Sequence, residues 1–215
     1  MAIKVTSTFS IVAIDPGEGA VGSAVASCSL AVGAVVPYVK RKVGAVNTQH
    51  YACPRLAREI LERMSRGMEP QGALNDVLQA DKDSENRQII AISMANAKCA
   101  WTGKKCLKPN NFKIGRQCVA AGNRLADESV VDAMVDAFDN SEGIALAERL
   151  LQSLEAGWRR GGDSLGHESA ALSVVPEEIN EGWPANLIDL RVDHHAEPIR
   201  ELHRIYDVFA LRNKR

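Results

Sequence analysis

Two short polar segments carry groups that could act on a carbonyl compound. Gly161, Gly162 and Asp163 follow an apolar helical stretch and place open backbone N–H groups beside a carboxylate. Asn123, which follows Gly122, has a side-chain amide that could donate a hydrogen bond to a developing oxyanion. Each has a plainer interpretation, because Gly-Gly also ends helices and Asn also stabilises turns. Residue type and spacing leave both interpretations open.

A glycine pattern near the N-terminus suggests nucleotide chemistry but lacks half of the motif. Residues 17–22 spell G-x-G-x-x-G after an apolar strand. A dinucleotide site also needs a helix directly after the glycines and an acid about 20 residues later to bind the ribose. The next residues are β-like, and no acid occurs between Glu18 and Glu59. We interpret the segment as a Gly-rich hairpin turn and expect no cofactor.

Histidines and cysteines form two further combinations. His50 and Cys53 flank a strand-to-helix turn before Pro54, which makes a Cys-His dyad conceivable, but no third group orients it. Asp193 and His195 would share one face of a strand, where an ion pair is the simpler interpretation. None of the five histidines has the spacing of a metal-binding motif, so we predict no metal site.

Hydrophobic periodicity predicts the elements that would position these groups. Period-2 and β-branched runs indicate strands, and apolar stripes at helical spacing indicate helices that begin near Pro54, Pro70, Asp127, Leu146 and Pro198. The strands are expected near 9–14, 21–26, 31–36, 43–48, 87–94, 98–102, 116–121, 169–175 and 186–192. The order is sheet, two helices, sheet, two helices, sheet, helix. This segregation predicts a single-domain α+β layered sandwich.

Composition excludes several classes of protein. The chain has 215 residues, of which 46% are hydrophobic, and a net charge of −1, so it can bury a core and lacks the basic surface of a nucleic-acid binder. The sequence contains no signal peptide and no apolar run long enough to span a membrane. Its five cysteines are odd in number and include no C-x-x-C pair, which is typical of reduced thiols. We expect a cytoplasmic protein without nucleic-acid or membrane partners.

Several segments, taken together and in order, resemble one family, the bacterial and archaeal domain of unknown function 1028. The resemblance runs from Thr8 to the final helix. The matching segments are 8–13, 30–37, 43–46 with 48–49, 131–134, 156–157 with 161–163, and 189–193. The resemblance implies the four-layered αββα sandwich of the N-terminal nucleophile (Ntn) hydrolases, and it implies no established reaction.

The resemblance also implies a nucleophile. An Ntn hydrolase exposes a Thr, Ser or Cys as its first residue, and the α-amino group, with an ordinary pKa of about 7.7 to 8.0, takes the proton during attack on an amide. Thr8 begins the first matching strand, but seven residues precede it. We therefore divide the chain into a leader, residues 1–7, and one Ntn-hydrolase-like domain, residues 8–215. Catalysis by this mechanism requires a cut after Ser7. Without that cut, Thr8 could still act if another base served it, and Ser10 would face the same side of the strand.

Three hypotheses follow. The first is a hydrolase of amide C–N bonds in a small molecule or peptide, with Thr8 as nucleophile, Asp163 as a site carboxylate and Asn123 as an oxyanion donor. The second is a catalytically silent ligand-binding or oligomeric module on the same fold. The leader supports this second hypothesis, as does a segment that reads Trp-Thr-Gly at 101–103, where the family pattern leads us to expect His-Thr-Gly. The third is a metal-assisted hydrolase that uses His50, His167 or His195. Apolar edges permit a homodimer, although a monomer explains the same pattern.

Overall fold

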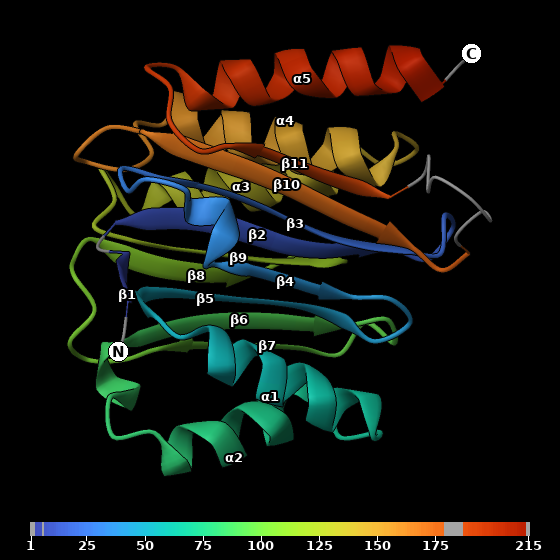
Figure 1. The fold of residues 1–215 in the computed structure, drawn as a ribbon. Helices are drawn as coiled ribbons and strands as arrows, with labels where there is room; N and C mark the ends of the chain where they lie inside the picture. The colour runs from blue at the N-terminus through green and yellow to red at the C-terminus, as the bar shows by residue number, and fades with distance from the viewer. Residues whose placement is uncertain (1–2, 6, 179–186, 214–215) are drawn as a thin grey trace.

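The computed structural model describes residues 3–5, 7–178 and 187–213. Two antiparallel sheets are stacked face to face and covered by helices on both outer sides (Figure 1). The layers run helix, sheet, sheet, helix, so the α+β αββα sandwich is confirmed.

Sheet A has the strand order β1-β5-β6-β7, and β4 also pairs with β5. Its strands are β1 (Ile3–Val5), β4 (Pro37–Lys40), β5 (Gly44–Ala52), β6 (Arg87–Ser93) and β7 (Lys98–Thr102). Sheet B has the order β11-β10-β3-β2-β9-β8. Its strands are β2 (Thr8–Asp15), β3 (Ala20–Ser27), β8 (Asn110–Ile114), β9 (Cys118–Asn123), β10 (Ser169–Pro176) and β11 (Ile188–Val192).

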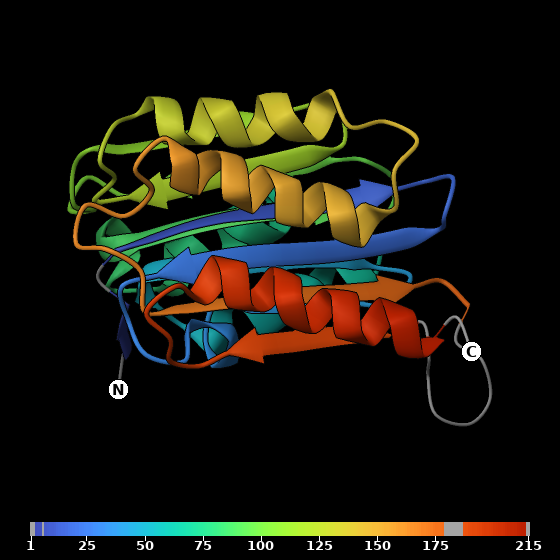
Figure 2. The same cartoon turned by 90° about the horizontal axis from the view of Figure 1, so that it is seen from above.

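Two helices cover sheet A, α1 (Pro54–Ser65) and α2 (Pro70–Ala80), and both begin with a proline, whose missing N–H costs nothing at that position. Three helices lie side by side over sheet B (Figure 2): α3 (Ser129–Asp139), α4 (Leu146–Arg159) and α5 (Pro198–Asn213). Two short 3₁₀ helices span Val32–Ala34 and Ser84–Asn86. Among the described residues, no helix is long and apolar enough to cross a bilayer.

Strand β2 is buried on both faces, so its side chains alternate between the layer under the helices and the layer between the sheets. Phe9 and Ile11 pack against the helices over sheet B, whereas Val12 and Ile14 pack between the two sheets. Side chains alternate along a strand, so Thr8 faces the space between the sheets. Strand β2 therefore carries the hydroxyl of its first residue, Thr8, into the interior of the sandwich.

The two outer layers have separate cores, and each contains a buried cysteine. Cys118 belongs to the core between sheet B and its helices, and Cys99 belongs to the core between sheet A and its helices. Burial raises the pKa of both thiols to about 12. Both cysteines therefore stay protonated at neutral pH and act as small apolar residues.

The predicted hairpin of residues 9–14 and 21–26 is confirmed, but one neighbouring segment was wrongly assigned. Residues 31–36 were expected to form a strand and instead contain the 3₁₀ helix, because Ala31 has a φ of 52° and the Val32 N–H bonds Ser169 Oγ at 2.9 Å. The strand follows at Pro37–Lys40. Proline has no backbone N–H to donate, and it is tolerated at the start of an edge strand because no neighbouring strand needs that donor.

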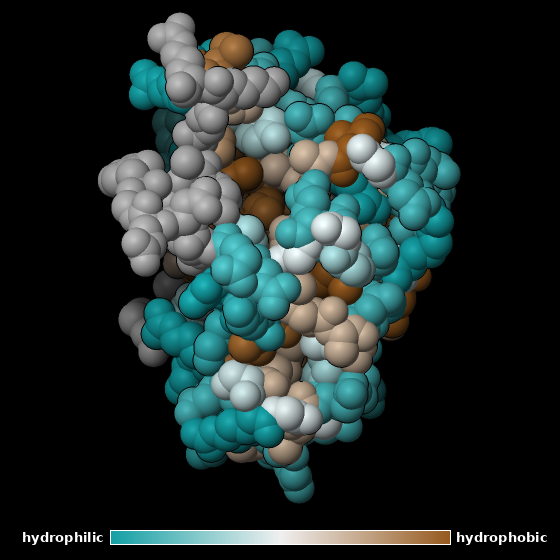
Figure 3. All heavy atoms as spheres, turned by 90° about the vertical axis from the view of Figure 1, so that its right-hand side faces the viewer, coloured by the Kyte–Doolittle hydropathy of each residue, from teal (hydrophilic) through white to brown (hydrophobic). Residues whose placement is uncertain are grey.

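The end of the sandwich that contains the β2–β3 turn, on the right in Figure 1, is the face drawn in Figure 3. It is largely hydrophilic, with separate small hydrophobic patches among the charged side chains. Thr8 lies at the other end of β2, which is eight residues long.

An ion pair fixes the end of α2 to sheet A. The Arg87 side chain is 3% exposed and donates to Asp81 from Nε at 2.7 Å and from Nη2 at 3.2 Å. Its Nη1 donates to the Tyr51 carbonyl oxygen at 2.5 Å. Burial acts to raise the pKa of the Asp81 carboxyl, but the hydrogen bonds and charge of Arg87 outweigh it and hold that pKa below the ordinary 3.8.

We expect Asp81→Asn to lower the free energy of unfolding by about 3 kcal/mol at pH 7, because it leaves the buried Arg87 with only the exposed Asp83 carboxylate, 3.5 Å away, as a charged partner. The folded-state pKa of Asp81 lies below its unfolded value, so this stabilisation is present above about pH 4 and disappears as pH falls through the folded pKa. Urea unfolding at pH 7 and pH 3 measures both effects. Asp76→Asn, which breaks a more exposed pair with Arg63, serves as the control and should change stability by less than about 1 kcal/mol. An equal loss in both variants would contradict the expectation.

Candidate active site

Thr8 lies in a row of polar side chains across the end of sheet B. Its Cα pairs with Ser27 on β3 and with Asn123 on β9. All three side chains are on the face toward sheet A, and all three residues are fully buried. The row therefore forms a polar end to an inter-sheet layer whose buried apolar side chains lie further along the strands.

The Thr8 hydroxyl begins a chain of hydrogen bonds that ends on the preceding peptide group. Thr8 Oγ1 donates to Ser27 Oγ at 3.4 Å, and Ser27 Oγ donates to the Ser7 carbonyl oxygen at 2.5 Å. The Ser29 N–H also donates to Ser27 Oγ, at 3.0 Å. Ser27 therefore polarises the carbonyl of the Ser7–Thr8 peptide bond and contacts the Thr8 hydroxyl.

On the other side of Thr8, the hydrogen bonds determine the orientation of the Asn123 amide. Gln88 Nε2 donates to the Gly122 carbonyl oxygen at 3.0 Å, so Gln88 Oε1 is the atom that faces Asn123. Asn123 Nδ2 donates to that oxygen at 3.0 Å. Asn123 Oδ1 is then left buried without a partner among the described residues. An unpaired buried acceptor costs about 1 to 3 kcal/mol, so this oxygen is available to a donor that enters the site.

Two glutamines extend the polar layer into sheet A. Gln49 Nε2 donates to Gln88 Oε1 at 2.8 Å, and Ser10 Oγ donates to Gln49 Oε1 at 2.7 Å. Gln88 Nε2 also reaches Thr102 Oγ1 at 3.0 Å. These contacts join the two sheets through side-chain amides directly beside Thr8 and Asn123.

Asp163 lies at the same end of sheet B and organises the main chain there. Its Oδ2 accepts from the Cys28 N–H and its Oδ1 from the Leu165 N–H, both at 2.9 Å. Asp163 also forms an isolated β-bridge with Leu125 and is 2% exposed. Cys28 follows Ser27 and Leu125 lies two residues after Asn123, so the structure brings all three predicted site residues to one end of sheet B.

The neighbouring thiol is not an alternative nucleophile. Burial, assisted by the charge of Asp163, raises the pKa of Cys28 to about 11. A thiol with that pKa is protonated at neutral pH and reacts slowly.

The members of the two pairs suggested by the sequence, His50 with Cys53 and Asp193 with His195, bond to other groups in the structure. His50 Nδ1 lies 2.9 Å from the Asn86 carbonyl oxygen, and the Cys53 N–H bonds Thr48 Oγ1. Asp193 pairs with Arg191, and His195 Nδ1 accepts the Glu197 N–H at 2.9 Å. Within the described ranges, no group of three or more His, Cys, Asp or Glu side chains is placed to hold a metal ion.

The described residues before Thr8, which are 3–5 and Ser7, are held against both sheets. Strand β1 pairs with β5, with Val5 opposite His50. Ser7 is fully buried, and its hydroxyl donates to the Arg124 carbonyl oxygen at 3.1 Å. Thr8 therefore has its nitrogen in a peptide bond and its side chain shielded from solvent.

Sequence reasoning proposed Thr8 and Asn123 as site residues but not Ser27 and Gln88, which the structure places in contact with them. Ser27 could have been found from the hairpin, because pairing Asp15 with Ala20 across the turn also pairs Thr8 with Ser27. Gln88 had no such signal, since it reaches the site from the other sheet and lies 35 residues from Asn123.

The turn at Gly162 supports this end of sheet B. Gly162 has a φ of 53°, and a Cβ added there would lie 2.3 Å from His167 Nε2 and 2.9 Å from Phe9 Cε1. Gly166, with a φ of 93°, has no atom within 4 Å of its added Cβ. Alanine at either position would adopt a strained positive φ, but only at position 162 would its Cβ also collide with other side chains.

We therefore expect Gly162→Ala to lower the free energy of unfolding by at least about 1 kcal/mol more than Gly166→Ala, with thermal unfolding as the measurement. Similar thermal unfolding midpoints for the two variants would contradict this expectation, because they would show that the His167 and Phe9 side chains move away from the added methyl group without cost.

Residues 8–202 match the model of the "Family of unknown function (DUF1028)". A crystal structure of a DUF1028 protein from Silicibacter pomeroyi is 30% identical over 94% of this chain and 88% of that chain, with a TM-score of 0.84. The ancestral β-subunit Anbu from Yersinia bercovieri is 9% identical over 95% of this chain and 94% of that one, with a TM-score of 0.43. No curated protein matches the chain.

Proposed function

The chain belongs to the DUF1028 family, and from that premise we propose that it is an Ntn-type hydrolase of amide C–N bonds in a small molecule or peptide. Thr8 is the proposed nucleophile. The observation that carries this proposal is the buried chain of hydrogen bonds from Thr8 through Ser27 to the Ser7 carbonyl oxygen. The match to the family model, which starts at Thr8, supports the same assignment.

The first proposed step removes the leader. Thr8 Oγ1 attacks the Ser7 carbonyl carbon while Ser27 stabilises the oxygen of that carbonyl, and the hydroxyl proton passes to the Thr8 nitrogen. The C–N bond breaks and leaves Ser7 as an ester on Thr8. Water then hydrolyses the ester, which releases the Ser7 carboxylate and restores the hydroxyl. Thr8 now has a free α-amino group.

Substrate cleavage repeats this chemistry on an external amide. The Thr8 amine takes the hydroxyl proton as Oγ1 attacks the amide carbon, and it returns the proton to the departing nitrogen. Water hydrolyses the resulting ester. Asp163 acts in this proposal by holding the Cys28 and Leu165 backbone groups, so it is a positioning residue.

For Asn123, the geometry favours a role different from oxyanion donation. Asn123 Nδ2 already donates to Gln88, whereas Oδ1 has no partner among the described residues. We assign Oδ1 as the acceptor that holds the N–H groups of the liberated Thr8 amine. A carbonyl oxygen beside an amine stabilises its protonated form and raises its pKa.

Intact-mass analysis of the purified chain tests the removal of the leader. We expect wild type and Thr8→Ser to begin at residue 8 and Thr8→Ala to keep its leader, because alanine has no hydroxyl to attack the Ser7 carbonyl. Ser10→Ala, which removes a buried hydroxyl on the same face of β2, should be processed like wild type. A wild-type chain that keeps its leader after prolonged incubation would contradict the proposal. Release of amine from a panel of amides should fall at least about 10³-fold in Thr8→Ala.

The role of Asn123 predicts a change in pH dependence. In the processed chain, Asn123→Ala removes the acceptor, so the pKa of the Thr8 amine should fall by about half a unit or more. Labelling of that amine with acetic anhydride across pH measures this value without a substrate. Asn47→Ala, at another asparagine buried between the sheets, should leave it unchanged. If Asn123 instead donates to an oxyanion, kcat for amide hydrolysis falls while the amine pKa stays constant.

One observation favours a second candidate function, a catalytically silent binding or oligomeric module. Thr8 and Ser7 are both fully buried, and β1 holds the leader against β5. In such a module Thr8 is only a strand residue, and the leader is a permanent part of sheet A. The mass measurement separates the two candidates, because a uniform start at residue 1 or 2 supports the module.

A further inference from the structure

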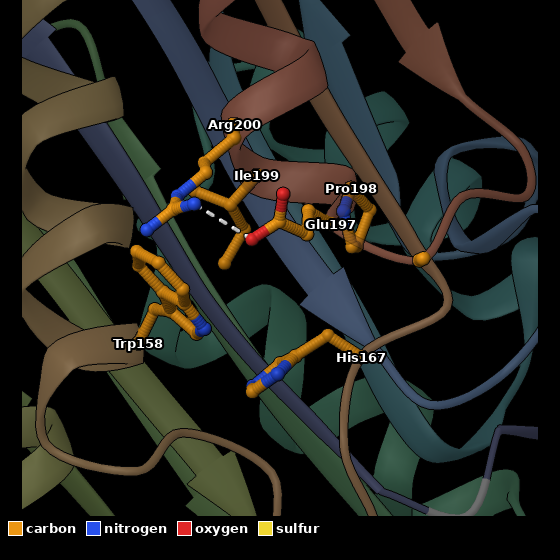
Figure 4. A pocket seen from close by; sticks show the side chains of 7 residues that line it. Trp158, His167, Glu197, Pro198, Ile199 and Arg200 are labelled. Carbon is orange, nitrogen blue, oxygen red and sulfur yellow. Dashed lines mark hydrogen bonds and ion pairs between the residues drawn. The ribbon is translucent and has the colours of Figure 1, made fainter.

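A separate cavity lies on the opposite side of sheet B from the Thr8 hydroxyl. It has a volume of about 150 Å³ and is enclosed by the last turn of α4, the first turn of α5 and the segment that leads into β10. Its principal lining residues are Trp158, His167, Glu197, Pro198, Ile199 and Arg200 (Figure 4). Phe9, which contacts His167, faces the helix layer, whereas Thr8 faces sheet A. The cavity therefore lies outside the proposed hydrolytic site and is joined to it through the hydrogen bond between the Asp163 N–H and His167 Nε2.

Two aromatic rings form the sides of this cavity, and both are held in place. Trp158 is half-buried, and the Arg200 guanidinium lies over its ring, 5.2 Å from the ring centre. His167 meets Phe9 edge to face, with ring centres 5.6 Å apart and an interplanar angle of 89°. Figure 4 shows the indole and the imidazole on one side, with Ile199 and Glu197 opposite. The cavity therefore has preformed planar walls.

One hydrogen bond fixes the tautomer of His167. The Asp163 backbone N–H can only donate, and it lies 3.2 Å from His167 Nε2, so Nε2 is the accepting nitrogen. Burial lowers the pKa of the ring, which is therefore neutral at pH 7 and carries its proton on Nδ1. No described residue accepts a hydrogen bond from Nδ1. The imidazole thus offers one N–H donor to a ligand.

The charges around the cavity cancel. Arg200 Nη1 donates to Glu197 Oε1 at 2.7 Å, and the His167 ring is neutral. The cavity therefore offers no net charge to attract an anion or a cation, and a neutral polar ligand leaves this pair intact. The Glu197 carboxylate keeps unused lone pairs, so it can accept a further hydrogen bond.

Volume limits the ligand to one ring, because a cavity of about 150 Å³ is large enough for benzene. We propose that the cavity binds a neutral, single-ring nitrogen heterocycle that carries an N–H and a C=O group. The ring lies against the Trp158 indole, its carbonyl oxygen accepts from His167 Nδ1–H, and its N–H donates to the Glu197 carboxylate. Uracil is the simplest probe with this chemistry.

Calorimetry with uracil on the full chain tests the proposal. For a ligand of this size we expect a Kd of about 1 mM, with the indole resonance of Trp158 shifting in NMR spectra on binding. 1,3-Dimethyluracil has no N–H and should bind at least about tenfold more weakly. Benzoate, which has a ring of similar size and a negative charge, should not compete.

Substitutions of the lining residues test which side chains bind uracil. Glu197→Leu removes the exposed acceptor and should weaken uracil binding at least about tenfold. Glu201→Leu, one turn further along α5 and paired with Arg204, is the matched control and should leave Kd unchanged. His167→Phe should abolish binding while retaining a ring at that position. The proposal is overturned if uracil does not bind at 20 mM, if benzoate binds more tightly than uracil, or if Glu197→Leu leaves the affinity of a folded chain unchanged.

Discussion

The architecture depends on the burial of β2 from both sides. This strand has β3 and β9 as neighbours, sheet A on one face and the helix α4 on the other. A strand with no solvent-facing side must place each side chain in one of two interiors, and a one-residue shift would exchange them. Phe9 and Ile11 belong to one interior, and Thr8 and Ser10 belong to the other. The register of β2 therefore determines both the larger core and the position of the candidate nucleophile.

The inter-sheet space divides into a mostly apolar half and a polar half. Val12, Ile14 and Ile90 lie in the first half, together with one polar pair, in which Ser23 Oγ donates to Asn47 Oδ1 and Asn47 Nδ2 has no partner among the described residues. The second half contains Gln88 and Asn123 side chains whose amides must satisfy one another, and one acceptor is left over. A core selected only for stability would avoid this arrangement, because an unsatisfied polar group is more costly than an aliphatic one. Such departures from good packing are expected at functional sites.

Sequence reasoning recovered the elements whose patterns are local. The hairpin of β2 and β3 and the helices that begin at Pro54 and Pro70 follow from alternation, turn residues and N-terminal prolines. The strand β8 was missed because Asn110–Ile114 is short, polar and at an edge, where pairing with β9 rather than composition creates the strand. The contact of Gln88 with Asn123 was missed for a related reason, since it depends on how two sheets stack, which no local pattern encodes.

The protonated thiols of Cys99 and Cys118 have a practical consequence. One lies beneath the helices of sheet A and the other beneath the helices of sheet B, so neither reacts until its own layer opens. Alkylation kinetics at each cysteine would report the opening free energy of that half of the sandwich. Equal values would mean that the two halves separate and melt as one cooperative unit, whereas different values would identify the half that loosens first.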